Sequence, residues 1–292
     1  MTPWLVALAV ASLAGPQGPG EVTGRQGAPL APRIDLRAPA EMAPQAERLA
    51  RFDTARLVAV MRLVGLDEAG PPIPVFLAPE DGLLAQQTPA WVAGFATGTE
   101  VVLFPARAPS YPHDSLQELL QHEVAHVLIG RAAGGRRVPR WFHEGVALAA
   151  ERTWSLGDRT HFALDVAFGG TVSAASIDRL FQAGAGPAAR AYRLSGMLVQ
   201  DLLKVHGPDL PARVLTGMRR GLAFDAAFEA AAGTSVDEAT DAFWRRRLWV
   251  TWLPWLTSPA ALWTLVTLLA LAAFAAVRWR RARRRWDDEE WE

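Results

Sequence analysis

The stretch Gln121–His126 constrains this chain more than any other sequence feature, because it contains the pattern HExxH. Positions i and i+4 of a helix lie on one face, so His122 and His126 can bind the same metal ion. Glu123 lies one residue round the helix, from where its carboxylate can approach a metal-bound water. Zinc lowers the pKa of such a water to about 7, and a neighbouring carboxylate can accept its proton. The pattern therefore predicts a zinc site; the alternative is a surface helix with two solvated histidines.

A second informative stretch, Val138–Ala147, follows a short loop that contains Gly134–Gly135. Glycines end helices well, and Pro139 suits the first turn of a new helix, so the predicted order is helix, loop, helix. The second helix can then present Glu144 as a third zinc ligand. Two histidines and one glutamate leave a fourth position open, which is typical of catalytic zinc. His143 is the alternative third ligand, but it points about 100° away from Glu144 around a helix.

HExxH followed by W-x-x-E-G-x-A at 141–147 resembles the gluzincin metallopeptidases. The similarity is to the bacterial peptidase-MA-like family in particular and, more distantly, to aminopeptidase N-type enzymes. It covers roughly residues 33–248, although the interval between the two motifs is one residue shorter than in the aminopeptidases. The resemblance implies a zinc-dependent hydrolase with one Zn2+ per chain, bound by His122, His126 and Glu144, and with Glu123 as the general base.

The resemblance also implies roles for residues outside the two motifs. Related enzymes carry a tyrosine near the helix that Tyr192 opens, and its hydroxyl stabilises the developing oxyanion; a half-buried packing tyrosine is the alternative. A strand at the position of Gly94 borders the gluzincin cleft and pairs with the substrate backbone; an ordinary core hairpin is the alternative. Glu151 lies on the face of Glu144, where it can hydrogen-bond a zinc-bound histidine, but a solvated carboxylate at the helix end is the favoured interpretation.

Composition narrows the partners and the chemistry of the site. The net formal charge of the 292 residues is zero, so no bulk attraction to nucleic acid is implied. The chain contains no cysteine, which excludes disulfides and cysteine-ligated zinc. Any metal must therefore be held by histidines and carboxylates. The resemblance to metallopeptidases implies a peptide or protein substrate as the partner.

Both ends of the chain carry apolar segments. The run from Trp4 to Ala14 is too short to span a bilayer and predicts a signal peptide at 1–14, although no Lys or Arg precedes it. A Gly/Pro-rich linker is expected at 15–32, before a peptidase domain at 33–248.

The C-terminal apolar segment follows a juxtamembrane stretch at 249–257. Pro259–Val277 has nineteen residues without a charge, which nearly spans a hydrocarbon core of about 30 Å and predicts a transmembrane helix at 258–277. A buried core helix is the alternative. The following tail, 278–292, is first Arg-rich and then acidic. The excess of arginines after the helix predicts a single-pass protein of a bacterial-type cell membrane, with an extracytoplasmic catalytic domain and a cytoplasmic C-terminus.

The expected fold class is α+β, with a small mixed sheet packed on helices, the zinc helix pair, a C-terminal helical lobe and one transmembrane helix. Apolar spacing predicts a helix at 46–66 and helices over 207–248. Strands are predicted at 92–96, at 101–104 and at 73–78, the last demoted to an edge strand by Pro74. Loops and short helices are expected over 153–190.

The predicted function is peptide-bond hydrolysis by a membrane-anchored zinc metallopeptidase. An endopeptidase is slightly favoured, since no motif near Gly94 supplies carboxylates for a substrate's free amine. The alternative is a non-catalytic zinc-containing binding or receptor domain on the cell envelope. Glu123 counts against this alternative, because zinc binding alone does not need it.

Overall fold

The computed structural model describes residues 31–151, 156–247 and 259–289. The predicted signal peptide, most of the linker and the juxtamembrane stretch lie outside the described residues. The described elements, in chain order, are β1 (Ile34–Arg37), η1 (Ala40–Met42), α1 (Ala43–Ala50), α2 (Ala55–Val64), β2 (Ile73–Leu77), α3 (Leu83–Gln87), β3 (Gly94–Ala96), β4 (Val101–Leu103), η2 (Pro105–Arg107), α4 (Leu116–Ala132), α5 (Arg140–Glu151), α6 (Leu156–Gly169), α7 (Ala174–Leu180), α8 (Ala185–His206), α9 (Leu210–Arg219), α10 (Phe224–Ala232), α11 (Val236–Arg245) and α13 (Pro259–Glu289).

The sheet is small and mixed, as predicted, with the strand order β1-β2-β4-β3. β1, β2 and β4 run parallel, whereas β3 runs antiparallel to β4 and forms one edge. Alternate side chains point to opposite faces of a strand. Val75 and Leu103 therefore join the main core beneath α2 and α4, while Phe76 and Phe104 lie on the other face, near α3. The sequence did not predict β1.

The prediction that Pro74 makes β2 an edge strand is wrong, because β2 lies between β1 and β4. Along a parallel strand, successive N–H groups point to opposite neighbours. Ile73 N–H donates to Arg33 of the β1 side, and Ala78 N–H donates to Leu103 of β4. The nitrogen of Pro74 therefore faces the β4 side, one residue before the pairing with β4 begins at Val75. No ladder hydrogen bond is lost, so the proline is tolerated.

Two helix predictions also need correction. The predicted helix at 46–66 is two helices, α1 and α2, because the chain turns at 51–54 and the Asp53 carboxylate accepts a hydrogen bond from the Ala55 N–H. The stretch 153–190, expected to hold loops and short helices, contains the 14-residue α6 and the seven-residue α7 in its described part. The helical lobe expected over 207–248 is present as α9, α10 and α11.

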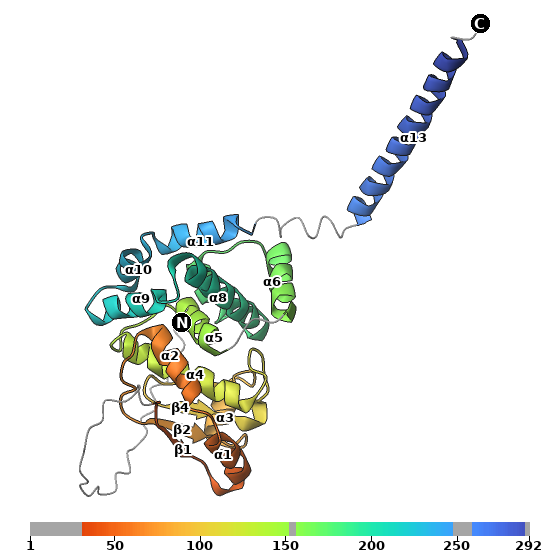
Figure 1. The fold of residues 1–292 in the computed structure, drawn as a ribbon. Coiled ribbons are helices and arrows are strands. Elements are labelled where there is room, and N and C mark those ends of the chain that lie inside the picture. The colour runs from red at the N-terminus through yellow and green to blue at the C-terminus, as the bar shows by residue number, and fades with distance from the viewer. Residues whose placement is uncertain (1–30, 152–155, 248–258, 290–292) are drawn as a thin grey trace, which may run out of the picture.

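α4 occupies the middle of the domain. It packs on β3 and β4 on one side and on α5 on the other, and α5 in turn packs on α8 (Figure 1). Further along the chain, α13 extends away from these elements in Figure 1. Its segment Leu262–Trp279 is long and apolar enough to cross a membrane, and none of that segment is buried.

The crossing of α5 and α8 depends on Gly145. A Cβ atom at this position would lie 2.6 Å from the Ser195 carbonyl oxygen and would overlap the side chain of Val199. The two backbones can approach closely only because Gly145 has no side chain. This close approach fixes the distance between α5 and α8, and therefore the position of Glu144 relative to the rest of the core.

We expect Gly145→Ala to destabilise the protein by about 1–3 kcal/mol, because overpacking at a backbone contact forces the helices apart. The matched control is Gly130→Ala within α4, where a Cβ would meet nothing within 4 Å. That change should be neutral or stabilise by up to about 1 kcal/mol. Thermal unfolding of the full chain in neutral detergent should show a drop of roughly 2–10 °C for Gly145→Ala. Equal midpoints for both variants would contradict this account of the crossing.

Candidate metal centre

α4 carries the HExxH residues on its buried side. The Ser115 hydroxyl caps the helix by accepting a hydrogen bond from Glu118 N–H at 3.2 Å. The chain leaves the helix through Gly134 and Gly135, whose φ angles of 66° and 74° favour glycine. His122 is only 1% exposed, so the helix brings this polar side chain into the domain interior.

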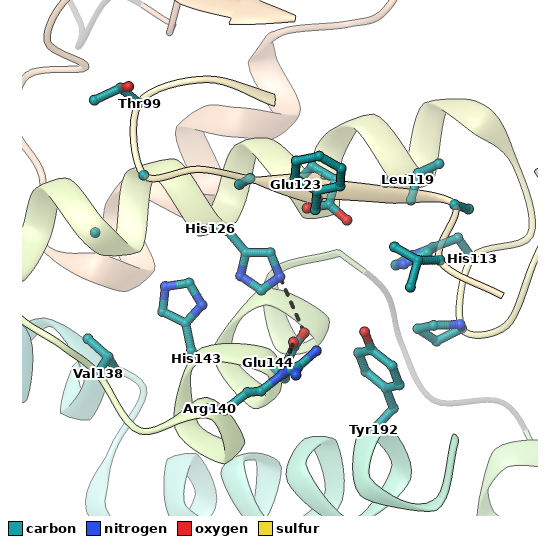
Figure 2. Close-up of a pocket in the computed structure, with 18 of the residues that line it drawn as sticks. Thr99, His113, Leu119, Glu123, His126, Val138, Arg140, His143, Glu144 and Tyr192 are labelled. Carbon is teal, nitrogen blue, oxygen red and sulfur yellow. Dashed lines mark hydrogen bonds and ion pairs between the residues drawn. The ribbon is translucent and has the colours of Figure 1, made fainter. Parts of the chain in front are cut away.

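α5 is positioned by a contact from a distant part of the chain. Its first backbone N–H groups, those of Arg140 and Trp141, donate to the carboxylate of Asp178 on α7, at 3.2 and 2.6 Å. A carboxylate satisfies N–H groups that have no partner within the helix and interacts favourably with the helix dipole. The start of α5 is thereby fixed, and Glu144 at its second turn points toward α4 (Figure 2).

The structure brings His122, His126 and Glu144 together. The Glu144 Oε2 atom lies 3.2 Å from His122 Nε2 and 3.3 Å from His126 Nε2. Zinc binds such atoms at about 2.0–2.2 Å in tetrahedral geometry, which places neighbouring donors roughly 3.3–3.5 Å apart. All three donor atoms lie within 4.8 Å of one another, which is the arrangement of a possible metal site. The donor set and spacing therefore fit a zinc ion.

The two oxygens of Glu144 have different partners. Oε1 accepts a hydrogen bond from Arg140 Nε at 3.2 Å, which leaves Oε2 facing the two imidazoles. Burial raises the pKa of Glu144, but the neighbouring His126 and His122 outweigh burial and hold the pKa well below its ordinary value. The side chain is therefore a carboxylate, the form that a metal ion requires.

Glu123, the general base that the resemblance implies, is buried beside the candidate metal ligands. Its Oε2 atom is buried and has no hydrogen-bond partner within the described chain. Burial raises the pKa of Glu123, although His126 and His122 oppose the shift. Gly94 of β3 lies directly against it, because a Cβ on Gly94 would stand 3.2 Å from the Glu123 Cγ. The free oxygen therefore lies between α4 and the edge strand, next to the candidate metal ligands.

Glu151 is not the solvated helix-end carboxylate that the sequence favoured, because its side chain is 0% exposed. Oε2 lies 3.0 Å from His122 Nδ1, and Oε1 lies 3.0 Å from His113 Nδ1. Burial raises the pKa of Glu151, but the hydrogen bonds to both histidines lower it to about 2. The carboxylate fixes the His122 ring with Nε2 toward Glu144, so the alternative role of Glu151 as a partner of a ligand histidine agrees with the structure.

Sequence reasoning missed His113, which is 6% exposed and precedes α4. Its ring lies 4.4 Å from the His122 ring, and it shares Glu151 with that residue. The donor atoms of these three residues also lie close enough to form a second possible metal group, but His122 uses its other nitrogen there. No spacing rule links a histidine in a loop to helix residues further along the chain, so this contact arises from tertiary structure.

His143 and Tyr192 both line the cleft. The His143 ring stacks on the His126 ring, with centroids 4.5 Å apart, and does not belong to the three-ligand group. The Tyr192 ring lies 6.4 Å from that of His122 and packs against Phe181, while its hydroxyl points into the cleft beside Glu144 (Figure 2). Its position is compatible with both predicted roles, oxyanion stabilisation and packing.

The cleft above the metal centre has a volume of about 650 Å³. One wall is β3, whose residues Gly94, Phe95 and Ala96 line the cleft, and the floor includes Glu123 and His126. Within the described sheet, β3 pairs only with β4, so its other edge is left without a strand partner. The predicted position of this strand beside the cleft therefore matches the geometry.

Two helices that present two histidines, a glutamate and a second, unligated glutamate beneath an edge strand have the architecture of a metallopeptidase. The family model of the Peptidase MA superfamily matches residues 84–250, more than half of the chain. The chain therefore belongs to the Peptidase MA superfamily. No curated protein matches the sequence. The family assignment confirms the resemblance stated above and indicates a metallopeptidase-like fold, a hydrolase of the protease class and a typical dependence on a metal ion.

The geometry separates the two candidates for third ligand. Glu144→Ala should lower zinc affinity by well over 100-fold, because it removes one of three donors, whereas His143→Ala should retain nearly full affinity. Competition with a chromophoric chelator, read alongside zinc content by mass spectrometry, measures both. Wild-type affinity in Glu144→Ala would place the third ligand elsewhere.

We expect Glu151→Gln to lower zinc affinity about 10- to 100-fold, because the amide cannot orient both His122 and His113 as the carboxylate does. The control is Glu47→Gln, a change of an exposed residue on α1 that should leave the zinc affinity unchanged. The same competition assay applies, and circular dichroism should show that both variants remain folded. A zinc affinity in Glu151→Gln equal to that of the control would mean that the hydrogen bonds serve only packing.

Proposed function

We propose that this protein is a zinc metallopeptidase that hydrolyses peptide bonds, with His122, His126 and Glu144 as metal ligands and Glu123 as general base. The observation that carries the proposal is the buried oxygen of Glu123, which has no partner in the described part of the chain, beside three donor atoms that lie within 4.8 Å of one another. A zinc ion held there supplies a Lewis acid that polarises the scissile carbonyl and acidifies a water.

The residues around the proposed zinc site have separate roles in the reaction. Glu123 accepts the proton of the attacking water and delivers it to the leaving amine, which its free oxygen and raised pKa favour. Burial raises the pKa of Tyr192 well above its ordinary value, so its hydroxyl keeps its proton and can donate a hydrogen bond to the developing oxyanion. Glu151 holds the His122 ring in place throughout.

The edge of β3 provides the means to hold a substrate. An extended peptide that pairs with this edge would lie across Glu123 and His126, and main-chain hydrogen bonds would bind it without reading its sequence. An aminopeptidase needs carboxylates for the free amine of its substrate. In the described part of the chain, the carboxylates that line the cleft are Glu123 and Glu144, both at the metal centre. This favours endopeptidase activity.

The membrane helix completes the proposal. We assign Leu262–Trp279 as a single transmembrane span, with the peptidase domain at 33–248 outside the cytoplasm and the tail that follows the span inside. The arginines after the span support this orientation, because positively charged flanks favour the cytoplasmic side. The predicted signal peptide at 1–14 supports it too.

Replacement of Glu123 by glutamine separates the enzyme from a metal-containing binding domain. Glutamine is nearly isosteric, so zinc content and fold should persist, but it cannot accept a proton. Loss of a general base costs about 10²–10⁴-fold in rate, and the upper end is expected because the same group returns the proton. Cleavage of a peptide library by the full chain, with a chelator control, provides the measurement. Wild-type rates in Glu123→Gln would refute the mechanism, and no cleavage by the zinc-loaded wild type would favour the binding domain.

Protease treatment of intact spheroplasts tests the orientation. The peptidase domain should be digested from outside, while an epitope tag after Glu292 survives until the membrane is permeabilised. Digestion of the tag with protection of the domain would reverse the assignment.

A further inference from the structure

Acidic and basic side chains are unevenly distributed along the cleft, and the proposed hydrolysis does not require this distribution. Within the described chain, the acidic residues that line it, Glu123 and Glu144, are both committed to the metal centre. All the other charged residues in its lining are arginines: Arg131, Arg136, Arg137 and Arg140.

These arginines differ in their partners. Arg140 donates to Glu144, and the Arg131 guanidinium donates to the Ala69 carbonyl oxygen. Arg136 and Arg137 lie exposed in the loop between α4 and α5. Neither forms an ion pair with a carboxylate in the part of the chain that the structure describes, whereas other arginines do. Two cations in the cleft wall therefore have no ion-pair partner among the residues that the structure describes.

The position of the two arginines along the cleft follows from α4. The cleft runs from His113 and Leu119 at one end to Thr99 and Val138 at the other, and Arg137 directly precedes Val138 (Figure 2). From His126 to Ala132, where α4 ends and the loop that carries Arg136 and Arg137 begins, the helix rises about 9 Å. An extended peptide covers that length in two to three residues. The cationic end therefore lies within reach of substrate residues close to the scissile bond.

We propose that Arg136 and Arg137 form a carboxylate-binding subsite, about two to four residues from the scissile bond, so that the enzyme selects acidic peptides. This inference rests on the proposed function and names its substrate class. A guanidinium binds a carboxylate through paired N–H groups, and opposite charge also speeds encounter. The carboxylate can come from an Asp or Glu side chain or from the C-terminus of the substrate.

The test uses the full chain in neutral detergent and fluorescent peptides of one parent sequence. Each peptide carries either Glu or Gln at two to four residues on one side of the scissile bond, with a free or amidated C-terminus. Binding is measured by anisotropy with zinc-loaded Glu123→Gln, and cleavage is measured with the active chain. Arg136→Gln/Arg137→Gln is compared with Arg51→Gln/Arg56→Gln, whose exposed arginines lie outside the cleft.

Glu peptides should bind and be cleaved roughly 3- to 30-fold better than Gln peptides. That preference should weaken with salt, disappear in the Arg136/Arg137 variant and persist in the control. A preference that follows only the free C-terminus assigns the subsite to the terminal carboxylate. Equal binding of Glu and Gln peptides with either terminus, or a preference that survives in the Arg136/Arg137 variant, overturns the subsite. Acid-selective binding without cleavage supports the subsite and overturns the peptidase; cleavage without acid preference does the reverse.

Discussion

The structure depends on the contact between Glu144 and the two imidazoles of α4. This contact joins α4, which packs on the sheet, to α5, which packs on α7 and α8. Burial of these polar groups would be costly without partners, and the pairing supplies them. Two further polar atoms of the cluster extend the network: the second oxygen of Glu144 accepts a hydrogen bond from Arg140, and the second nitrogen of His122 lies 3.0 Å from a Glu151 oxygen. In the described part of the chain, His126 Nδ1 has no hydrogen-bond partner. The candidate metal ligands and the contact between α4 and α5 are thus built from the same residues.

Sequence patterns predicted the parts of the fold that depend on interactions between residues close together in the chain. The helix–loop–helix around Gly134–Gly135 and the hairpin of β3 and β4 followed from glycine positions and apolar spacing. Strand neighbours are a long-range property, which explains the two errors in the sheet. The sequence placed Pro74 in an edge strand because proline has no N–H group to donate to a neighbouring strand. The pairing of β2 with β4 begins one residue later, at Val75 and Val101, so no N–H group is needed at Pro74. β1 was missed because its four residues alternate between partly buried and exposed positions and carry little apolar signal.

The residues of the candidate site show the same difference between local patterns and long-range contacts. His122, His126 and Glu144 lie in two motifs whose order predicts convergence, and the structure places their donor atoms together. Glu123 lines the same cleft. Glu151 was assigned to solvent by its residue type, but α5 carries it beneath His122. His113 and Asp178 had no sequence signal, since each acts on a helix far from it in the chain. Residues that support a site from other elements are visible only once the chain is folded.

The Asp178 carboxylate at the start of α5 has a thermodynamic consequence. It belongs to α7, yet it fixes the first turn of the helix whose second turn carries Glu144. Occupation of the metal centre and docking of α7 therefore favour each other by the same free energy, since coupling between two equilibria is reciprocal. A bound ion stabilises the folded chain in proportion to the logarithm of its concentration. The concentration of available metal ion would then set the resistance of α7 to local opening.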